Sequence, residues 1–249
     1  MRLIFIRHAE PDYKHNCLTE KGIREAEILS RRTALWNTEH IRKIYVSPLP
    51  RAKMTAEPTL LKWNREAEEI PWLREFEYRI THPSTGKLHV PWDLYPEYFS
   101  EYPDMYDRER WINTPLYSSN PEIKTAYQEI CESIDALLAE NGYHRNPEGS
   151  GTMYDLDRSL TDGDEENALV FFCHFGVTAV ILSHLIGVSP FILLHHTVIL
   201  PTGITIVNAE KRVPDKAHLR IQVLGDVRHL GQAGEPFSTH AAFSPAFEG

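Results

Sequence analysis

The sequence has few cysteines and no long apolar segment, and each absence narrows the class of protein. Its 249 residues include 3 cysteines, Cys17, Cys131 and Cys173. An odd number of thiols, two of them inside apolar patterns, argues against a disulfide framework and for a reducing compartment. The apolar run before Arg7 is too short for a signal-peptide core, and no run approaches a membrane span. We therefore expect a cytoplasmic protein without membrane contact.

Positive charge is also scarce. Lys and Arg number 26 against 35 Asp and Glu, which gives a formal net charge of -9. A field of this sign repels nucleic acid and anionic membranes, so neither is an expected partner. An anionic substrate would have to meet a local cationic pocket. The sequence shows no internal repeat and no interdomain linker, so we expect a single domain over residues 1–249.

Two apolar runs each end in a histidine. Residues 3–6 form a continuous apolar run that predicts a strand buried on both faces, and Arg7 and His8 follow it. Residues 168–173 predict a second buried strand, followed by His174 and an apolar helix over 177–186. The predicted fold is α/β: a three-layer sandwich with a mostly parallel central sheet and helices on both faces. In such folds ligands bind at the carboxyl ends of the strands.

The other segments are less distinctive, but most can be assigned. Thr19 can cap a helix whose solvated face carries Glu25, Glu27, Arg31 and Arg32. We expect a helix from Arg51 to about Thr59, where Pro58 kinks or ends it, and a long helix opening at Pro121. The remaining expectations are strands at 43–47, 70–73, 203–208 and 219–224, a mobile acidic loop at about 146–167, and a polar tail at 226–249. Residues 76–120 alternate prolines with aromatics, which predicts an inserted cap rather than a disordered segment.

The two strand-end histidines lie beside predicted helix starts, where free backbone amides favour anions. Arg7 and Arg51 add full charges suited to bidentate contact with phosphate oxygens. The other histidines that could suggest a metal lack a ligand spacing or a Cys partner, so we expect no metal and no other cofactor. These are His82, His89, His195 and His196.

Several short motifs then occur in a recognisable order. They are Arg7-His8-Ala9-Glu10, Leu18 to Gly22, Ser47 to Ala56, Leu73-Arg74-Glu75, His174-Phe175-Gly176 and Arg228-His229-Leu230. Their order and spacing resemble the histidine phosphatase superfamily, the phosphoglycerate-mutase-like proteins. The resemblance covers about residues 1–75 and 168–230, and no motif aligns over 76–167.

The resemblance implies a role for each site residue. His8 would be the nucleophile that becomes a phosphohistidine, with Arg7, Arg51 and His174 binding the phosphoryl oxygens around it. Glu75 would protonate the leaving oxygen and later activate water. The implied activity is metal-independent hydrolysis of a phosphomonoester, with a small phosphorylated metabolite as substrate.

Departures from the family pattern leave alternatives open. Ala9 stands where glycine is usual, and Glu75 is followed by Phe76-Glu77-Tyr78 without the common glycine and tryptophan, so Glu77 is a rival acid. The short span from Glu10 to Leu18 favours a phosphatase over a phosphoglycerate-mutase-type transferase. A non-catalytic member that binds a phosphorylated ligand is a further alternative.

Overall fold

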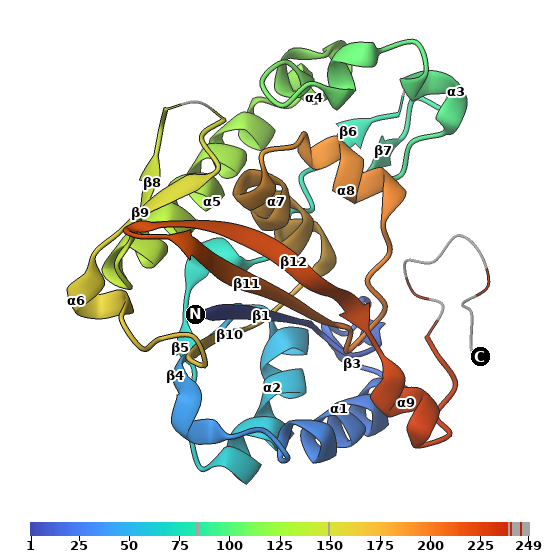
Figure 1. Cartoon of the computed structure of the whole chain (residues 1–249). Helices are drawn as coiled ribbons and strands as arrows, with labels where there is room; N and C mark the ends of the chain where they lie inside the picture. The colour runs from blue at the N-terminus through green and yellow to red at the C-terminus, as the bar shows by residue number, and fades with distance from the viewer. Residues whose placement is uncertain (83–84, 149, 239, 241–244, 246–249) are drawn as a thin grey trace.

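The computed structural model describes residues 1–82, 85–148, 150–238, 240 and 245, and its main element is an eight-stranded sheet (Figure 1). The strand order is β5-β4-β10-β1-β11-β12-β9-β8. The first four strands are parallel: β5 (Glu68–Glu69), β4 (Ile41–Val46), β10 (Ala168–Cys173) and β1 (Arg2–Arg7). The other four pair antiparallel: β11 (Ile204–Val213), β12 (Lys216–Asp226), β9 (Met153–Leu156) and β8 (Tyr143–Asn146). The α/β fold is thus confirmed, and the parallel strands form the half of the sheet from β5 to β1.

The central strands are buried on both faces, as their continuous apolar sequences predict. Along β1, Leu3 and Phe5 face one apolar core while Ile4 and Ile6 face the other. Residues of β10 alternate between the same two cores. Because side chains alternate along a strand, an unbroken apolar run requires cover on both faces.

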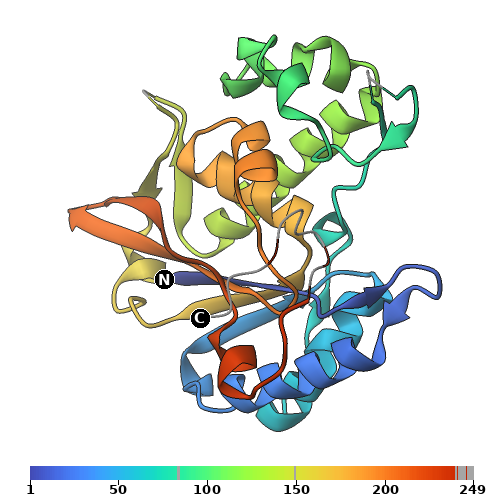
Figure 2. The same cartoon turned by 90° about the vertical axis from the view of Figure 1, so that its right-hand side faces the viewer.

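Helices provide that cover (Figures 1 and 2). One face carries α1 (Glu20–Thr33), α2 (Pro50–Trp63) and α9 (Arg228–Gln232), and the other carries α5 (Pro121–Glu140), α7 (Phe175–Ile186) and α8 (Pro190–His196). The Thr19 hydroxyl accepts the Gly22 amide at 3.0 Å, so the expected cap of α1 is present. In the part of the chain that the structure describes, no helix is long and apolar enough to cross a membrane. The three cysteines are free thiols.

Two predictions were wrong: the end of the helix near Thr59 and the strand at 70–73. Helix α2 continues through Pro58 to Trp63, because its last turns are held by packing: Trp63 is buried and donates its indole N–H to the Thr33 carbonyl at 2.9 Å. Residues Pro71–Leu73 form a 3-10 helix, η2, and the edge strand is β5 just before it. Proline suits the first turn of a helix and is poorly placed in a ladder, which explains the second change.

Regular structure also occurs where loops were expected. Segment 146–167 contains β9 and the short helix α6 (Arg158–Thr161). The expected polar tail begins with the end of β12 and then α9, in which His229 and Leu230 are buried. The remaining short elements are β2 (Pro11–Asp12), β3 (Cys17–Leu18) and η1 (Thr38–His40).

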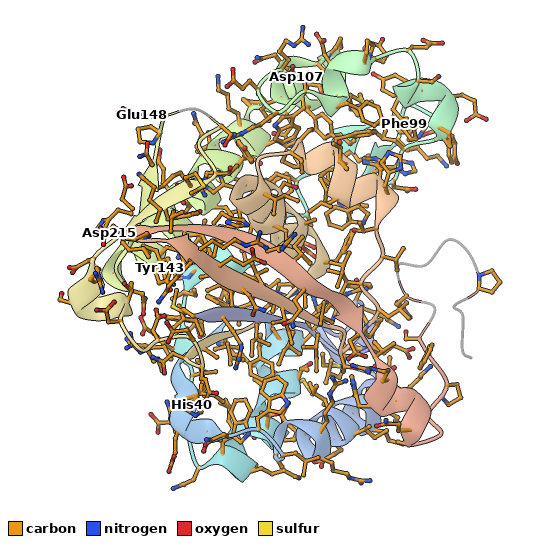
Figure 3. The ribbon with its side chains drawn as sticks, in the orientation of Figure 1. His40, Phe99, Asp107, Tyr143, Glu148 and Asp215 are labelled. Atoms are coloured by element: carbon orange, nitrogen blue, oxygen red, sulfur yellow. The ribbon has the colours of Figure 1, made fainter. Side chains whose placement is uncertain are left out.

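Segment 76–120 lies beyond α5, α7 and α8, at the end of the molecule away from α1 and α2 (Figures 1 and 2). It contains β6 (Ile80–Thr81), β7 (Leu88–His89), α3 (Pro96–Phe99), η3 (Pro103–Tyr106), η4 (Trp111–Asn113) and α4 (Pro115–Ser118). Its aromatic residues do pack: Phe99 lies beside α8 (Figure 3), with its ring centroid 5.1 Å from that of Phe191. The aromatics thus join this segment to the helical layer.

Candidate active site

The residues that directly follow three adjacent parallel strands come together at one edge of the sheet. β4, β10 and β1 are neighbours, and Arg7 pairs with Cys173 in the β1–β10 register. The His8 amide donates to the Cys173 carbonyl at 2.9 Å, and the Ser47 amide donates to the Phe172 carbonyl at the same distance. This places His174 between Ser47 and His8 along the edge, with the imidazole centroids of the two histidines 5.0 Å apart.

The imidazole of His8 has a defined tautomer. Its Nδ1 lies 2.7 Å from the Ala9 carbonyl, which can only accept, so Nδ1 carries the proton and Nε2 carries the lone pair. Nε2 is buried and has no hydrogen-bond partner among the described residues. Burial, reinforced by Arg7 and Arg51, lowers the pKa of His8 well below its ordinary value. The ring is therefore neutral near pH 7 and presents an uncommitted lone pair, as a nucleophile requires.

Two buried guanidinium groups lie near the histidines and act on both electrostatically. Arg7 is 3% exposed and Arg51 is 5% exposed. Arg7 Nη1 donates to the Ile199 carbonyl at 2.6 Å, and the Nε atoms of both arginines are buried without a partner in the described part of the chain. The ring of Tyr13 covers the Arg51 guanidinium at 5.5 Å. An acidic protein thus contains the local cluster of cationic groups that an anionic substrate requires.

His174 is oriented by Ser47. The Ser47 Oγ lies 2.7 Å from His174 Nε2 and accepts the Leu49 amide at 3.3 Å. The serine hydroxyl can donate to Nε2 or accept from it; when it donates, the proton of His174 sits on Nδ1, which is buried without a partner among the described residues. Burial, with His8 and Arg51 nearby, lowers the pKa of His174 well below its ordinary value. The sequence places Ser47 in a motif but indicates no role for it.

The two rival carboxyl groups occupy different environments. Glu75 is 7% exposed, and its Oε1 accepts the amides of Phe76 at 2.9 Å and Val177 at 3.1 Å. Burial raises the pKa of Glu75, although those amides and Arg51 favour the charged form. The Glu77 side chain is 42% exposed and lies 3.9 Å from Arg51. Glu75 belongs to the buried cluster, and Glu77 lies at its rim.

Two further side chains hold the loop after His8, and sequence reasoning missed both. The Thr55 hydroxyl accepts the Ala9 amide at 2.9 Å, and Glu25 Oε2 accepts the Glu10 amide at 2.7 Å. Glu25 was expected on the solvated face of α1, yet it is 0% exposed. Its position beside two small, buried residues of α1, Gly22 and Ala26, was the available signal.

Glu25 is expected to make stability depend on pH. Burial raises its pKa to about 7, although the Glu10 amide and Lys21 favour the charged form. Because the unfolded carboxyl titrates near 4.5, the stability present below that pH is lost as pH rises through about 7. Glu25→Gln should therefore match wild type near pH 4.5 and exceed it by roughly 2–3 kcal/mol at pH 8. Urea unfolding at both pH values measures this difference.

The matched control is Glu27→Gln, because the Glu27 side chain is 49% exposed on the same helix. It should change the free energy of unfolding by less than about 0.5 kcal/mol at either pH. An equal effect of Glu25→Gln at both pH values would show that Glu25 does not titrate differently in the folded state.

The four histidines that could suggest a metal lie in segment 76–120 and in α8. The ring centroids of His82 and His89 lie 4.8 Å apart in segment 76–120, and His89 Nδ1 pairs with Asp93 at 2.6 Å. His195 and His196 end α8. Within residues 1–82, 85–148, 150–238, 240 and 245, no group of three or more His, Cys, Asp and Glu is placed to hold a metal ion.

Comparisons with known proteins bear on the family and on the fold. The sequence model of the histidine phosphatase superfamily (branch 1) matches residues 3–101. No curated protein matches the chain. Among solved structures, a phosphoserine phosphatase variant from Entamoeba histolytica bound to phosphoserine is 19% identical, with 92% of this chain and 98% of that chain covered and a TM-score of 0.55.

Two further structures share the fold. A mycobacterial glucosyl-3-phosphoglycerate phosphatase is 14% identical, with 90% of this chain and 98% of that chain covered and a TM-score of 0.56. The α-ribazole phosphatase of Shigella flexneri is 18% identical, with 91% and 96% covered and a TM-score of 0.53. The family's sequence model covers the segment that carries Arg7, His8 and Arg51, so the resemblance of residues 3–101 to the histidine phosphatase superfamily is confirmed.

Proposed function

We propose that the chain is a metal-independent phosphatase that hydrolyses a small phosphomonoester through a phosphohistidine on His8. One observation carries the proposal: His8 has a buried Nε2 without a partner among the described residues, its ring centroid lies 5.0 Å from that of His174, and the buried Arg7 and Arg51 act on it electrostatically. A neutral nucleophile among fixed cationic and N–H donors is what phosphoryl transfer needs.

The reaction follows in two displacements. His8 Nε2 attacks phosphorus, the bond from phosphorus to the leaving oxygen breaks, and Glu75 gives that oxygen its proton. Water then attacks the phosphohistidine, the Glu75 carboxylate takes the water's proton, and inorganic phosphate leaves. Arg7, Arg51 and the Nδ1–H of His174 stabilise the equatorial oxygens in both steps. The raised pKa of Glu75 suits a group that must act first as acid and then as base.

The expected substrate is a small phosphorylated metabolite. The residues around the phosphoryl position are buried, so only a slender phosphate-bearing end can reach His8. Solved structures with this fold are named as phosphatases of phosphoserine, glucosyl-3-phosphoglycerate and α-ribazole phosphate, which are small phosphomonoesters. The span from Glu10 to Leu18 folds as a short hairpin of β2 and β3. This compact connection favours hydrolysis over the mutase alternative.

A panel assay tests the proposal. Wild-type protein in EDTA is incubated with phosphorylated metabolites, and inorganic phosphate and isomerised phosphoglycerate are both measured. Rapid quenching at alkaline pH, followed by mass spectrometry, should find phosphate on the peptide that contains His8. Isomerised phosphoglycerate without phosphate release would identify a mutase. Tight binding of phosphorylated ligands, with no hydrolysis of any substrate and none of aryl phosphates, would identify a binding protein.

Gly176 is expected to be indispensable for this chemistry. A Cβ at this position would lie 2.5 Å from Trp92 Cζ3 and 2.8 Å from Glu75 Oε1, closer than van der Waals contact allows. Gly176→Ala should therefore displace Glu75 and lower kcat by about 100-fold, since a misplacement near 1 Å has that effect. Steady-state kinetics on the best substrate measures the loss.

The matched control is Gly231→Ala. A Cβ on Gly231 would meet only Phe237 at 3.7 Å, which is an ordinary contact, so this variant should retain kcat. A fully active Gly176→Ala protein would mean that Glu75 tolerates displacement and is not the proton donor.

A further inference from the structure

Thr202, in the turn before β11, adopts a strained backbone conformation next to the end of β1. Its φ is +58°, in the left-handed region, and its side chain is fully buried. A β-branched residue in this region is a rare outlier that persists only when its surroundings hold it there. The strain therefore requires an account from the contacts that Thr202 makes.

Those contacts are with the backbone of Arg7 and His8. The Thr202 amide donates to the Arg7 carbonyl at 3.1 Å and to the His8 carbonyl at 3.3 Å. In the next residue, the Gly203 carbonyl accepts the Arg7 amide at 3.1 Å. The turn before β11 thus binds the backbone of Arg7 and His8 through both donors and acceptors. Any rotation of Thr202 would release the carbonyl of the residue that carries the nucleophile.

The side chain of Thr202 is fixed from the opposite face of the turn. Its Oγ1 donates to the Pro201 carbonyl at 2.7 Å and lies 2.9 Å from His229 Nε2. His229 Nδ1 lies 3.4 Å from an Arg32 nitrogen, which can only donate, so Nδ1 accepts and Nε2–H donates to Thr202. Arg32 in turn donates to Asp226 at 2.8 Å.

This chain of bonds joins α1 and α9 to the nucleophile. Burial lowers the pKa of His229 to about 4, so its ring stays neutral and keeps the donor and acceptor pattern described above. His229 lies in the Arg228-His229-Leu230 motif, to which the proposed reaction gives no role. Neither His229 nor Thr202 hydrogen-bonds the reacting imidazole, so any effect on chemistry must act through the backbone of Arg7 and His8.

We propose that Thr202, held by His229, is a positioning residue that fixes the His8 backbone so that Nε2 points in line with the phosphorus–leaving-group bond. The inference rests on the proposed function, and it adds residues outside the phosphate pocket. A fixed line of attack matters because bound reactants must already stand in a near-attack geometry. Loss of the Thr202–His229 hydrogen bond should slow phosphorylation of His8 while leaving the arginines free to bind phosphate.

The experiment compares two pairs of variants in the full-length chain. Thr202→Val removes the hydroxyl and keeps the β-branched shape, whereas Thr202→Ser keeps the hydroxyl. His229→Asn retains an acceptor for Arg32 but is too short to reach Thr202, whereas His229→Gln can offer an N–H at the Nε2 position. We expect Thr202→Val and His229→Asn each to lower kcat by about 10- to 100-fold with KM within threefold of wild type. Thr202→Ser and His229→Gln should recover most of that loss.

Two additional measurements separate positioning from general destabilisation. The control Thr161→Val removes the hydroxyl of a buried residue of α6, which donates to the carbonyl of the helix cap Asp157 at 3.0 Å, and it should lower stability without changing kcat. The double variant of Thr202→Val and His229→Asn should be no slower than the worse single variant, because both break one tether. If the kcat losses of the two single variants instead add in the double variant, the two residues act separately and the inference is overturned.

Three outcomes are distinguishable. A Thr202→Val protein that melts earlier yet turns over at the wild-type rate per folded molecule overturns the inference. So does a rise in KM with unchanged kcat, because it places the effect on binding. If no residue of the wild-type chain becomes phosphorylated during turnover, the proposed function is wrong. The positioning role of Thr202, which rests on it, is then overturned as well.

Discussion

His8→Ala is expected to lower phosphate release from the best substrate by at least about 10⁴-fold, because the nucleophile and the covalent route are lost together. The remaining arginines and His174 can still bind phosphate, so affinity for inorganic phosphate should fall far less than kcat. The alkaline-stable phosphopeptide should be absent from quenched reactions of this variant. Single-turnover kinetics with isothermal titration of phosphate separates the two effects.

A surface histidine provides the control for this change. His218 lies on β12 with a 38% exposed side chain, so His218→Ala should retain the wild-type kcat. An active His8→Ala protein would contradict the phosphohistidine mechanism. Loss of phosphate affinity by the same factor as kcat would instead make His8 a ligand for the substrate rather than its nucleophile.

The sequence could place the two histidines because strand ends follow simple rules. An apolar run that ends in a polar residue marks a buried strand and its exit, and parallel neighbours bring their exits to one edge. That reasoning located His8 and His174, which the register of β1 and β10 brings side by side. Arg51 followed from the expected helix start at the end of β4, and α2 does begin at Pro50.

The supporting residues could not be found in this way, because their roles depend on contacts between distant segments. Thr202 lies in a turn whose left-handed φ no periodicity reports, and its partner His229 was expected in a polar tail. Glu25 looked like any solvated helix position until packing against the loop at Glu10 buried it. Local propensity also gave the wrong end for α2, since burial of Trp63 outweighs the effect of Pro58.

The choice between Glu75 and Glu77 is open to a sharp test with two substrates. Glu75→Gln keeps an acceptor for the amides of Phe76 and Val177 but can neither give nor take a proton. With an alkyl phosphate, whose leaving oxygen needs protonation, kcat/KM should fall by about 10²- to 10⁴-fold. Because burial raises the pKa of Glu75, the wild-type rate should decline on the alkaline side as this acid ionises. The variant should lack that decline.

With p-nitrophenyl phosphate the same variant should behave differently. Nitrophenolate leaves without a proton, so phosphorylation of His8 should proceed near the wild-type rate and release one equivalent of nitrophenol in a burst. Hydrolysis of the phosphohistidine should then be slow, because no carboxylate activates water. Glu77→Gln, the control at the rim of the pocket, should show neither the burst nor the leaving-group dependence. If Glu77→Gln shows both and Glu75→Gln neither, the proton donor is Glu77, and the buried carboxyl serves only to hold the first turn of α7.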